Sequence, residues 1–179
     1  MTAIISRRGE LLQLIYANEE TIALNKPLGC LAVSDPPQSN MYYRGWWAFI
    51  PDQPSIYHVF DYDLKQWVDP RSLDQIKDQK WSEIKEERET AEYGGFSFLG
   101  HIFDSDITSQ SRIITASEIG ADVEWTLKDN SIVSLDAEQL RGLRIALAQH
   151  VSNCHSRSRI ARQLIYDSES IEQIESIQF

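Results

Sequence analysis

The chain has 179 residues, of which 42% are hydrophobic and 10% aromatic, so it can build one core or two small ones. It carries 27 acidic and 17 basic side chains. Because this negative balance repels a phosphate backbone, we expect no nucleic acid partner. The apolar runs, such as residues 46–50, are much shorter than the roughly 20 residues of a membrane helix, so we expect no membrane span. With two cysteines and no signal-like start, we expect free thiols in a reducing cytoplasm.

The first part of the chain has the periodicity of strands. Short apolar segments are separated by polar turns, and Arg44-Gly45 and 61–64 each place a turn between two of them. The expected strands are 11–16, 21–24, 28–33, 41–43, 46–50, 56–60 and 65–68. Short strands at such regular intervals predict an all-β, sandwich-like domain over 1–69, with a small open barrel as the alternative.

At Asp69-Pro70 the periodicity changes to that of helices. Pro70 fits a first helical turn, and Ser72 with Gln75 alternatively supplies a capping box. The expected elements are a helix ending before Gly94, a strand at 96–98, a helix over 107–118, a ribbon of 123–127 with 131–135, a helix from Asp136 to about Tyr166, and a short last helix. We therefore predict an α+β chain whose second domain, 70–179, is mainly helical with a small two-stranded ribbon.

The chain lacks the local signatures of catalysis. It has neither a Gly-x-Ser-x-Gly elbow nor a glycine-rich loop that would hold phosphates. Asp61 and Asp63 could be imagined as the paired carboxylates of a glycan-processing enzyme, but their place in a hairpin turn favours ordinary turn chemistry. We expect no enzyme and no cofactor.

A metal site is also not expected. His150 and Cys154 lie four residues apart on one helix with His155 adjacent, but a closed zinc site needs four ligands. Asp104 and Asp106 lie beside Ser105 without the spacing of a calcium loop, so we expect helix capping there.

Aromatic residues are concentrated in the predicted hairpins. Nine large rings lie within residues 42–67, and alternation sends neighbours such as Trp46 and Trp47 to opposite faces, so one of the two should be outside. Exposed rings suit a protein interface, although both faces could be covered within the monomer, and sugar stacking stays open. The predicted contact residues are Tyr42, Tyr43, Trp46, Trp47, Phe49, Tyr57 and Phe60.

The long helix carries a stripe of apolar and small residues. Such a stripe can pack within the chain, which we favour, or can meet a partner subunit. In the second case the oligomerisation residues would include Leu140, Leu147 and Val151 on this helix, with Ile171, Ile174 and Phe179 at the chain end.

Four short motifs follow the charged helix in a fixed order. They are Gly94-Gly95-Phe96-Ser97-Phe98, Phe103-Asp104-Ser105-Asp106, Ser109-Gln110-Ser111-Arg112-Ile113 and Trp125-x4-Asn130. From about Leu73 to Ile165 this order resembles a domain at the C-terminal end of bacteriophage tail-fibre assembly proteins. The first 70 residues match that family only loosely, through 54–68.

The resemblance implies a chaperone that binds a trimeric, receptor-binding phage tail fibre and assists its folding and trimerisation. The aromatic residues would then contact the fibre, and three copies would assemble on one trimer as a 3:3 complex. The chain would act in the host cell cytoplasm during phage assembly or stay on the virion fibre. The alternative is a structural virion component, a fibre tip or adaptor that contacts the host receptor; the chain has no fibre-like repeats, which favours the chaperone.

Overall fold

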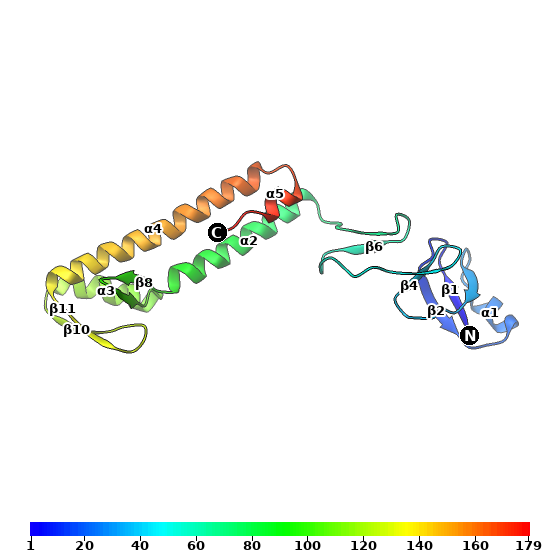
Figure 1. Ribbon diagram of the computed structural model, residues 1–179, viewed down its shortest axis with the longest axis horizontal. Coiled ribbons are helices and arrows are strands. Elements are labelled where there is room, and N and C mark those ends of the chain that lie inside the picture. Colours follow the sequence, from blue (N-terminus) through cyan, green and yellow to red (C-terminus); the bar gives the residue numbers. More distant parts are fainter. The chain divides into compact units, whose positions relative to one another are not determined.

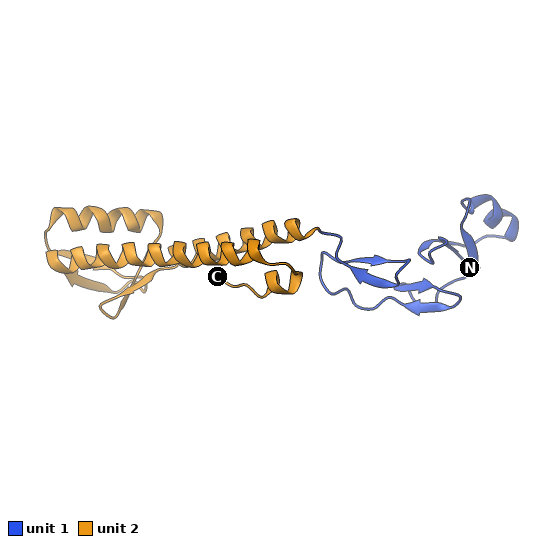
Figure 2. Cartoon of the chain, turned by 90° about the horizontal axis from the view of Figure 1, so that it is seen from above, with its two compact units in different colours: residues 1–71 blue, residues 72–179 orange.

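The computed structural model describes all residues from 1 to 179 and divides the chain into two compact units, 1–71 and 72–179 (Figure 2). The division lies two residues after the change of periodicity at Asp69-Pro70. The chain has 43% helix and 22% strand, with several small antiparallel sheets and a helical C-terminal region. The α+β class predicted from the sequence is therefore confirmed.

Unit 1 contains one three-stranded sheet and two hairpins (Figure 1). The central strand β1 (Thr2–Ile5) pairs antiparallel with β2 (Leu11–Ile15) on one side and with β3 (Leu31–Ser34) on the other. The hairpins are β4 (Met41–Tyr43) with β5 (Trp47–Phe49), and β6 (Val59–Asp61) with β7 (Gln66–Val68). Both hairpins lie where the sequence predicts them, but the strands are divided among three small sheets instead of forming the two larger sheets of a sandwich.

Two elements of unit 1 differ from the sequence prediction. Residues 21–24, predicted as a strand, lie in helix α1 (Glu19–Asn25), because the Asn18 side chain accepts a hydrogen bond from the Thr21 N–H at 2.9 Å and caps the helix. Strand β1 was not predicted. It is buried along almost its whole length at the centre of the sheet, and a strand buried on both faces shows an apolar run instead of alternation.

Unit 2 is built on two long helices that lie alongside each other, α2 (Leu73–Tyr93) and α4 (Ala137–Asp167) (Figure 1). Capping boxes begin both helices, Ser72 with Gln75 for α2 and Asp136 with Gln139 for α4. Helix α3 (Ile107–Ile119) packs on α4 and is capped by Asp106, and the short α5 (Ile171–Glu175) follows α4. The sequence prediction of these four helices is confirmed, and α2 begins at the Ser72 capping box, the alternative to a start at Asp69-Pro70.

Two hairpins complete unit 2. The pairing of β10 (Val123–Thr126) with β11 (Ile132–Leu135) is the predicted ribbon, and Asn130 adopts the expected left-handed conformation with φ of 65°. The predicted strand β8 (Phe96–Phe98) pairs with β9 (His101–Phe103), a strand too short to show a pattern in the sequence. Before β8, Gly95 has φ of 98°, and a Cβ there would lie 2.9 Å from the Phe103 carbonyl oxygen, so only glycine fits.

The cores of unit 2 use the inward face of α4. One cluster consists of Phe96, Phe103, Ile113, Leu127, Leu135, Leu140, Leu143 and Leu147, and a second of Ile84, Ala161 and Ile165. Leu140, Leu147 and Ile174 are buried within the chain, so the alternative that they form a contact between subunits is wrong, and the favoured packing within the chain holds. Val151 packs against the first cluster and Phe179 against the second, and Ile171 is half-buried. No helix combines the length and the apolar character that crossing a bilayer requires.

Candidate functional site

Part of the predicted contact surface in unit 1 is an aromatic core. Phe60 lies at its centre, with ring centroids 5.2 Å from Tyr42, 5.1 Å from Tyr62 and 5.5 Å from Trp67. Tyr42 and Phe60 are buried within the unit. Their prediction as partner-contact residues is therefore wrong. Alternation in a short strand shows that its two faces differ, but it does not show which face is buried in the core.

The other predicted contact residues lie at the surface to different degrees. Trp46 is 59% exposed and Phe49 54% exposed, and the Arg44 guanidinium lies 4.3 Å from the Trp46 ring centre. Trp47 is half-buried, since its indole N–H donates to the Ser34 carbonyl at 2.8 Å and its ring packs edge-on to Tyr43. Tyr57 is 37% exposed. The expectation that one of Trp46 and Trp47 lies outside is confirmed, and Trp46 is the outer residue.

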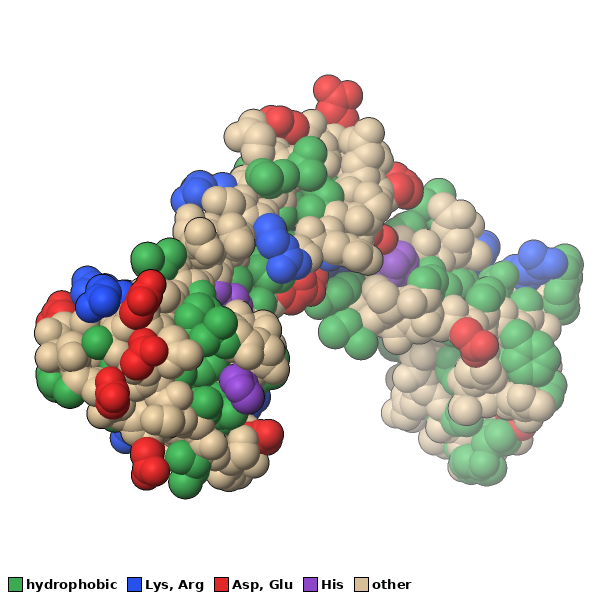
Figure 3. All heavy atoms as spheres, turned by 60° about the vertical axis from the view of Figure 1, so that its left-hand side comes forward, with side chains coloured by type: hydrophobic (Ala, Val, Ile, Leu, Met, Phe, Trp, Pro, Cys, Tyr) green, Lys and Arg blue, Asp and Glu red, His purple; other side chains and the backbone are tan.

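Unit 1 exposes an unusual amount of apolar surface for its size. It exposes 13 large hydrophobic side chains and buries six hydrophobic residues, whereas unit 2 exposes 11 and buries 14. Figure 3 shows hydrophobic side chains in green on the surface of unit 1, the fainter part of that view. We call the following residues the apolar surface of unit 1: Leu12, Leu14, Tyr16, Leu24, Leu28, Leu31, Trp46, Phe49, Ile56, Tyr57, Val59 and Leu64.

Sequence reasoning selected the rings of this surface and missed its aliphatic members. The available signal was the uncharged segment 11–16, since an exposed edge strand normally carries a charge or a proline. Strand β2 is paired on one side only and still exposes Leu12 and Leu14. Unit 1 has six basic and eight acidic residues, against 11 and 19 in residues 72–179. Its apolar surface is therefore not embedded in a strongly charged one.

The residues considered as metal ligands are engaged with other groups of unit 2. His150 Nε2 lies 3.1 Å from the carbonyl oxygens of both Ala91 and Glu92, and His155 Nε2 lies 3.3 Å from Glu92 Oε2. Cys154 lies between these two histidines in the sequence, and its side chain is buried. This burial, together with the nearby Glu92 carboxylate, raises the pKa of the Cys154 thiol. These groups stabilise the contact between α2 and α4.

Asp106 and Asp61 act as the expected helix cap and turn residue, whereas Asp104, for which capping was also expected, does not cap the helix. Asp106 accepts hydrogen bonds from the Thr108 and Ser109 N–H groups at 2.9 and 3.1 Å, and the Ser109 hydroxyl, which also donates to it, lowers the pKa of its carboxyl. Asp61 accepts from the N–H groups of Asp63 and Leu64 at 2.7 and 2.9 Å. Both carboxylates therefore hold the local backbone in place.

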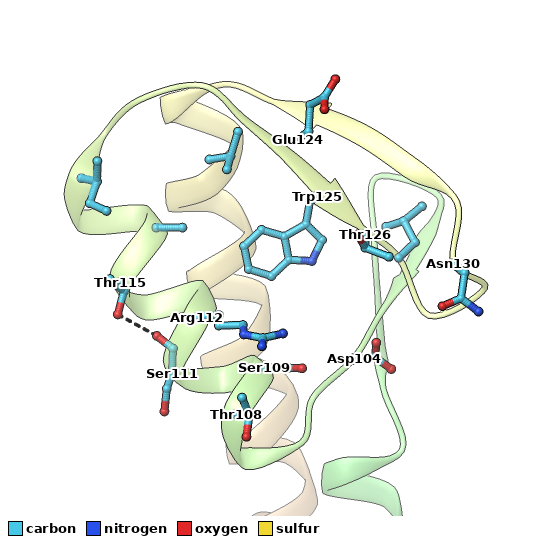
Figure 4. Close-up of a pocket in the computed structure, with 14 residues that line it drawn as sticks. Asp104, Thr108, Ser109, Ser111, Arg112, Thr115, Glu124, Trp125, Thr126 and Asn130 are labelled. Atoms are coloured by element: carbon cyan, nitrogen blue, oxygen red, sulfur yellow. Dashed lines mark hydrogen bonds between the residues drawn. The ribbon is translucent and has the colours of Figure 1, made fainter.

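A pocket of about 650 Å³ lies between α3 and the strand β10 in unit 2 (Figure 4). Six of its 14 lining residues belong to the motifs singled out in the sequence. They are Asp104, Ser109, Ser111, Arg112, Trp125 and Asn130. Motifs that are separate in the chain thus meet around one space, which sequence reasoning did not anticipate.

Comparison with known proteins places unit 2 in a family. Residues 75–178 match the family described as Domain of unknown function (DUF4376). No curated protein and no solved structure matches the chain. The family match spans more than half of the 179 residues and almost the whole of unit 2. The chain is therefore a member of the DUF4376 family.

Proposed function

We propose that this protein is an assembly chaperone of a trimeric phage tail fibre and that it holds the fibre through the apolar surface of unit 1. The resemblance of residues 73–165 to tail-fibre assembly proteins suggests the class of function. The observation that carries the proposal is that unit 1 exposes 13 large hydrophobic side chains and buries only six hydrophobic residues. Exposed apolar surface of this extent favours a protein partner.

The physical need for such a partner is clear in a fibre. Intertwined strands have contacts between residues distant in sequence, so they form slowly and leave apolar edges open during folding. A chain that covers those edges suppresses aggregation. The weak charge of unit 1 suits this role, since burial of its apolar surface requires little desolvation of charged groups.

A trimeric client is most simply served by three helpers, which leads to a 3:3 complex. The buried stripe of α4 is occupied within each copy, so contact between copies would use outward residues of this helix. Ile145, Ile160 and Leu164 are exposed there. The helper would act in the host cell cytoplasm or remain on the mature fibre.

The test is co-expression of the neighbouring fibre gene with the wild-type chain and with two variants. Trp46→Ala removes an exposed ring of unit 1, and Ile132→Ala, at a site 66% exposed in unit 2, is the matched control. We expect the wild type and the control to raise the yield of soluble fibre trimer, and Trp46→Ala to raise it less. Light scattering of the purified complex measures the stoichiometry.

Equal yields with and without the chain, over a range of temperatures, would refute the chaperone. If the chain is then found on purified virions, the structural fibre tip or adaptor becomes the better explanation. Trp46 lies outside the aromatic core, so its replacement tests binding with little effect on folding.

A further inference from the structure

We propose that the pocket between α3 and β10 is a binding site for an acidic sugar, a pyranose ring that carries a carboxylate. The pocket lies wholly within unit 2, and the proposal does not depend on the fibre-binding role of unit 1.

A free cation in the pocket determines the charge of the ligand. Arg112 extends from α3 into the space beneath the ring of Trp125 (Figure 4). Its guanidinium forms no hydrogen bond, ion pair or ring contact within the chain. An arginine fork without a partner is suited to a carboxylate, which it can bind through two parallel hydrogen bonds.

A flat apolar wall lies beside this cation. One side of Trp125 packs against the core of unit 2, with its ring centroid 6.5 Å from that of Phe103, and the residue also lines the pocket. Its indole N–H has no acceptor within the chain and is not enclosed. An aromatic wall with a polar edge suits a ring that has an apolar face and hydroxyl groups at its rim, as a pyranose has.

The remaining polar groups supply both donors and acceptors. The Ser109 and Ser111 hydroxyls donate to Asp106 and to the Ile107 carbonyl, so each retains only acceptor capacity. Asp104 adds a carboxylate acceptor, and Asn130 adds an amide that can both donate and accept. Sugar hydroxyls both donate and accept, so this mixture matches them.

The same groups argue against other anions. The Asp104 carboxylate lines the pocket together with Arg112, and it repels a doubly charged phosphate more strongly than a singly charged carboxylate. A carboxylate carries one charge, which Arg112 neutralises. The fold itself does not require Arg112 at this position, because the residue neither caps a helix nor enters a core cluster.

The experiment follows the indole N–H signals of the tryptophans by NMR in the full chain. The Trp125 signal is assigned with Trp125→Phe. Sodium glucuronate should shift this signal with a dissociation constant on the order of 1 mM, and glucose, which lacks the carboxylate, should bind at least about tenfold more weakly. A galacturonate trisaccharide that binds more tightly than glucuronate would identify a polysaccharide as the source of the sugar, and equal affinity would identify a monosaccharide.

Two variants locate the interaction. Arg112→Ala should reduce glucuronate affinity to that of glucose, and Arg141→Ala, an exposed arginine of α4 outside the pocket, should leave it unchanged. The proposal is overturned by the absence of a saturable Trp125 shift, by an unchanged affinity in Arg112→Ala, or by equal binding of glucose. Benzoate that binds as tightly as glucuronate would also overturn it, because the sugar hydroxyls would then contribute nothing.

Discussion

Replacement of Leu140 by alanine tests whether the apolar stripe of α4 is an internal core. The side chain is completely buried in the cluster that includes Phe103 and Leu143. The change removes about three methylene-sized groups, which corresponds to about 2.4 kcal/mol of transfer free energy. The cavity left behind raises the loss into the range of roughly 2–5 kcal/mol. We expect the free energy of unfolding of unit 2 to fall by about 3 kcal/mol, and its Tm by roughly 10–15 °C.

The measurement is urea unfolding followed by circular dichroism at the helical band, which reports mainly on unit 2 because α1 is the only helix of unit 1. The variant and the wild type are each unfolded at two protein concentrations. Ile145→Ala is the matched control on the same helix, and its exposed side chain should make the change worth less than about 0.5 kcal/mol.

Two results would refute this reasoning. If Leu140→Ala costs less than about 1 kcal/mol, the residue does not lie in a close-packed core. If the unfolding midpoint of the wild type rises with protein concentration, contacts between copies contribute to its stability, and the stripe would have to be reconsidered as a subunit interface.

Three further predictions follow from single residues. In the native chain only Cys30 should react rapidly with a thiol reagent, because Cys154 is buried and the pKa of its thiol is raised. In urea two thiols per chain should react. Rapid reaction of two thiols in the native chain would contradict this prediction. The Arg71 side chain hydrogen-bonds Asp69 at 3.0 and 3.1 Å and lowers the pKa of its carboxyl to about 2. The stabilisation by the ionised Asp69 carboxyl is present above the ordinary aspartate pKa and is lost as the pH falls toward 2. The difference in thermal stability between wild type and Asp69→Asn should therefore shrink between about pH 5 and pH 2. A difference that stays constant over this range would contradict the prediction. Ser105→Ala should destabilise unit 2 by about 1–3 kcal/mol in urea unfolding. The buried Ser105 hydroxyl accepts from the Gly95 N–H at 2.8 Å and donates to the Glu92 carbonyl at 2.5 Å, at the end of α2. An unchanged free energy of unfolding would show that these two backbone groups find other partners.

The starts of the helices in unit 2 could be read from the residues because capping is a short-range interaction. Ser72 with Gln75 and Asp136 with Gln139 satisfy N–H groups within one turn, so the signal and the structure lie in the same few residues. The turn at Asn130 is local in the same sense. Helix and hairpin positions in this unit were therefore predictable without knowledge of any distant contact.

Unit 1 was less predictable because its elements are short and their environments depend on the other segments. Residues 21–24 satisfy both a strand pattern and a helix pattern, and the cap at Asn18 decides between them. Phe60 and Trp46 are both large rings in predicted hairpin strands, yet Phe60 lies at the centre of the aromatic core and Trp46 at the surface. The difference depends on which rings meet, and that is set by pairing between separate hairpins.

The pocket shows most clearly the difference between what neighbouring residues determine and what tertiary contacts determine. Arg112, Trp125 and Asn130 could be recognised as parts of motifs, and their local roles on a helix, a strand and a turn follow from neighbouring residues. That these side chains meet around one pocket could not be predicted from the sequence. The meeting requires α3 to pack on α4 and the ribbon of β10 and β11 to lie over α3. Local hydrogen bonding and periodicity are written in consecutive residues, whereas burial and the meeting of side chains depend on contacts between segments that are far apart in the chain.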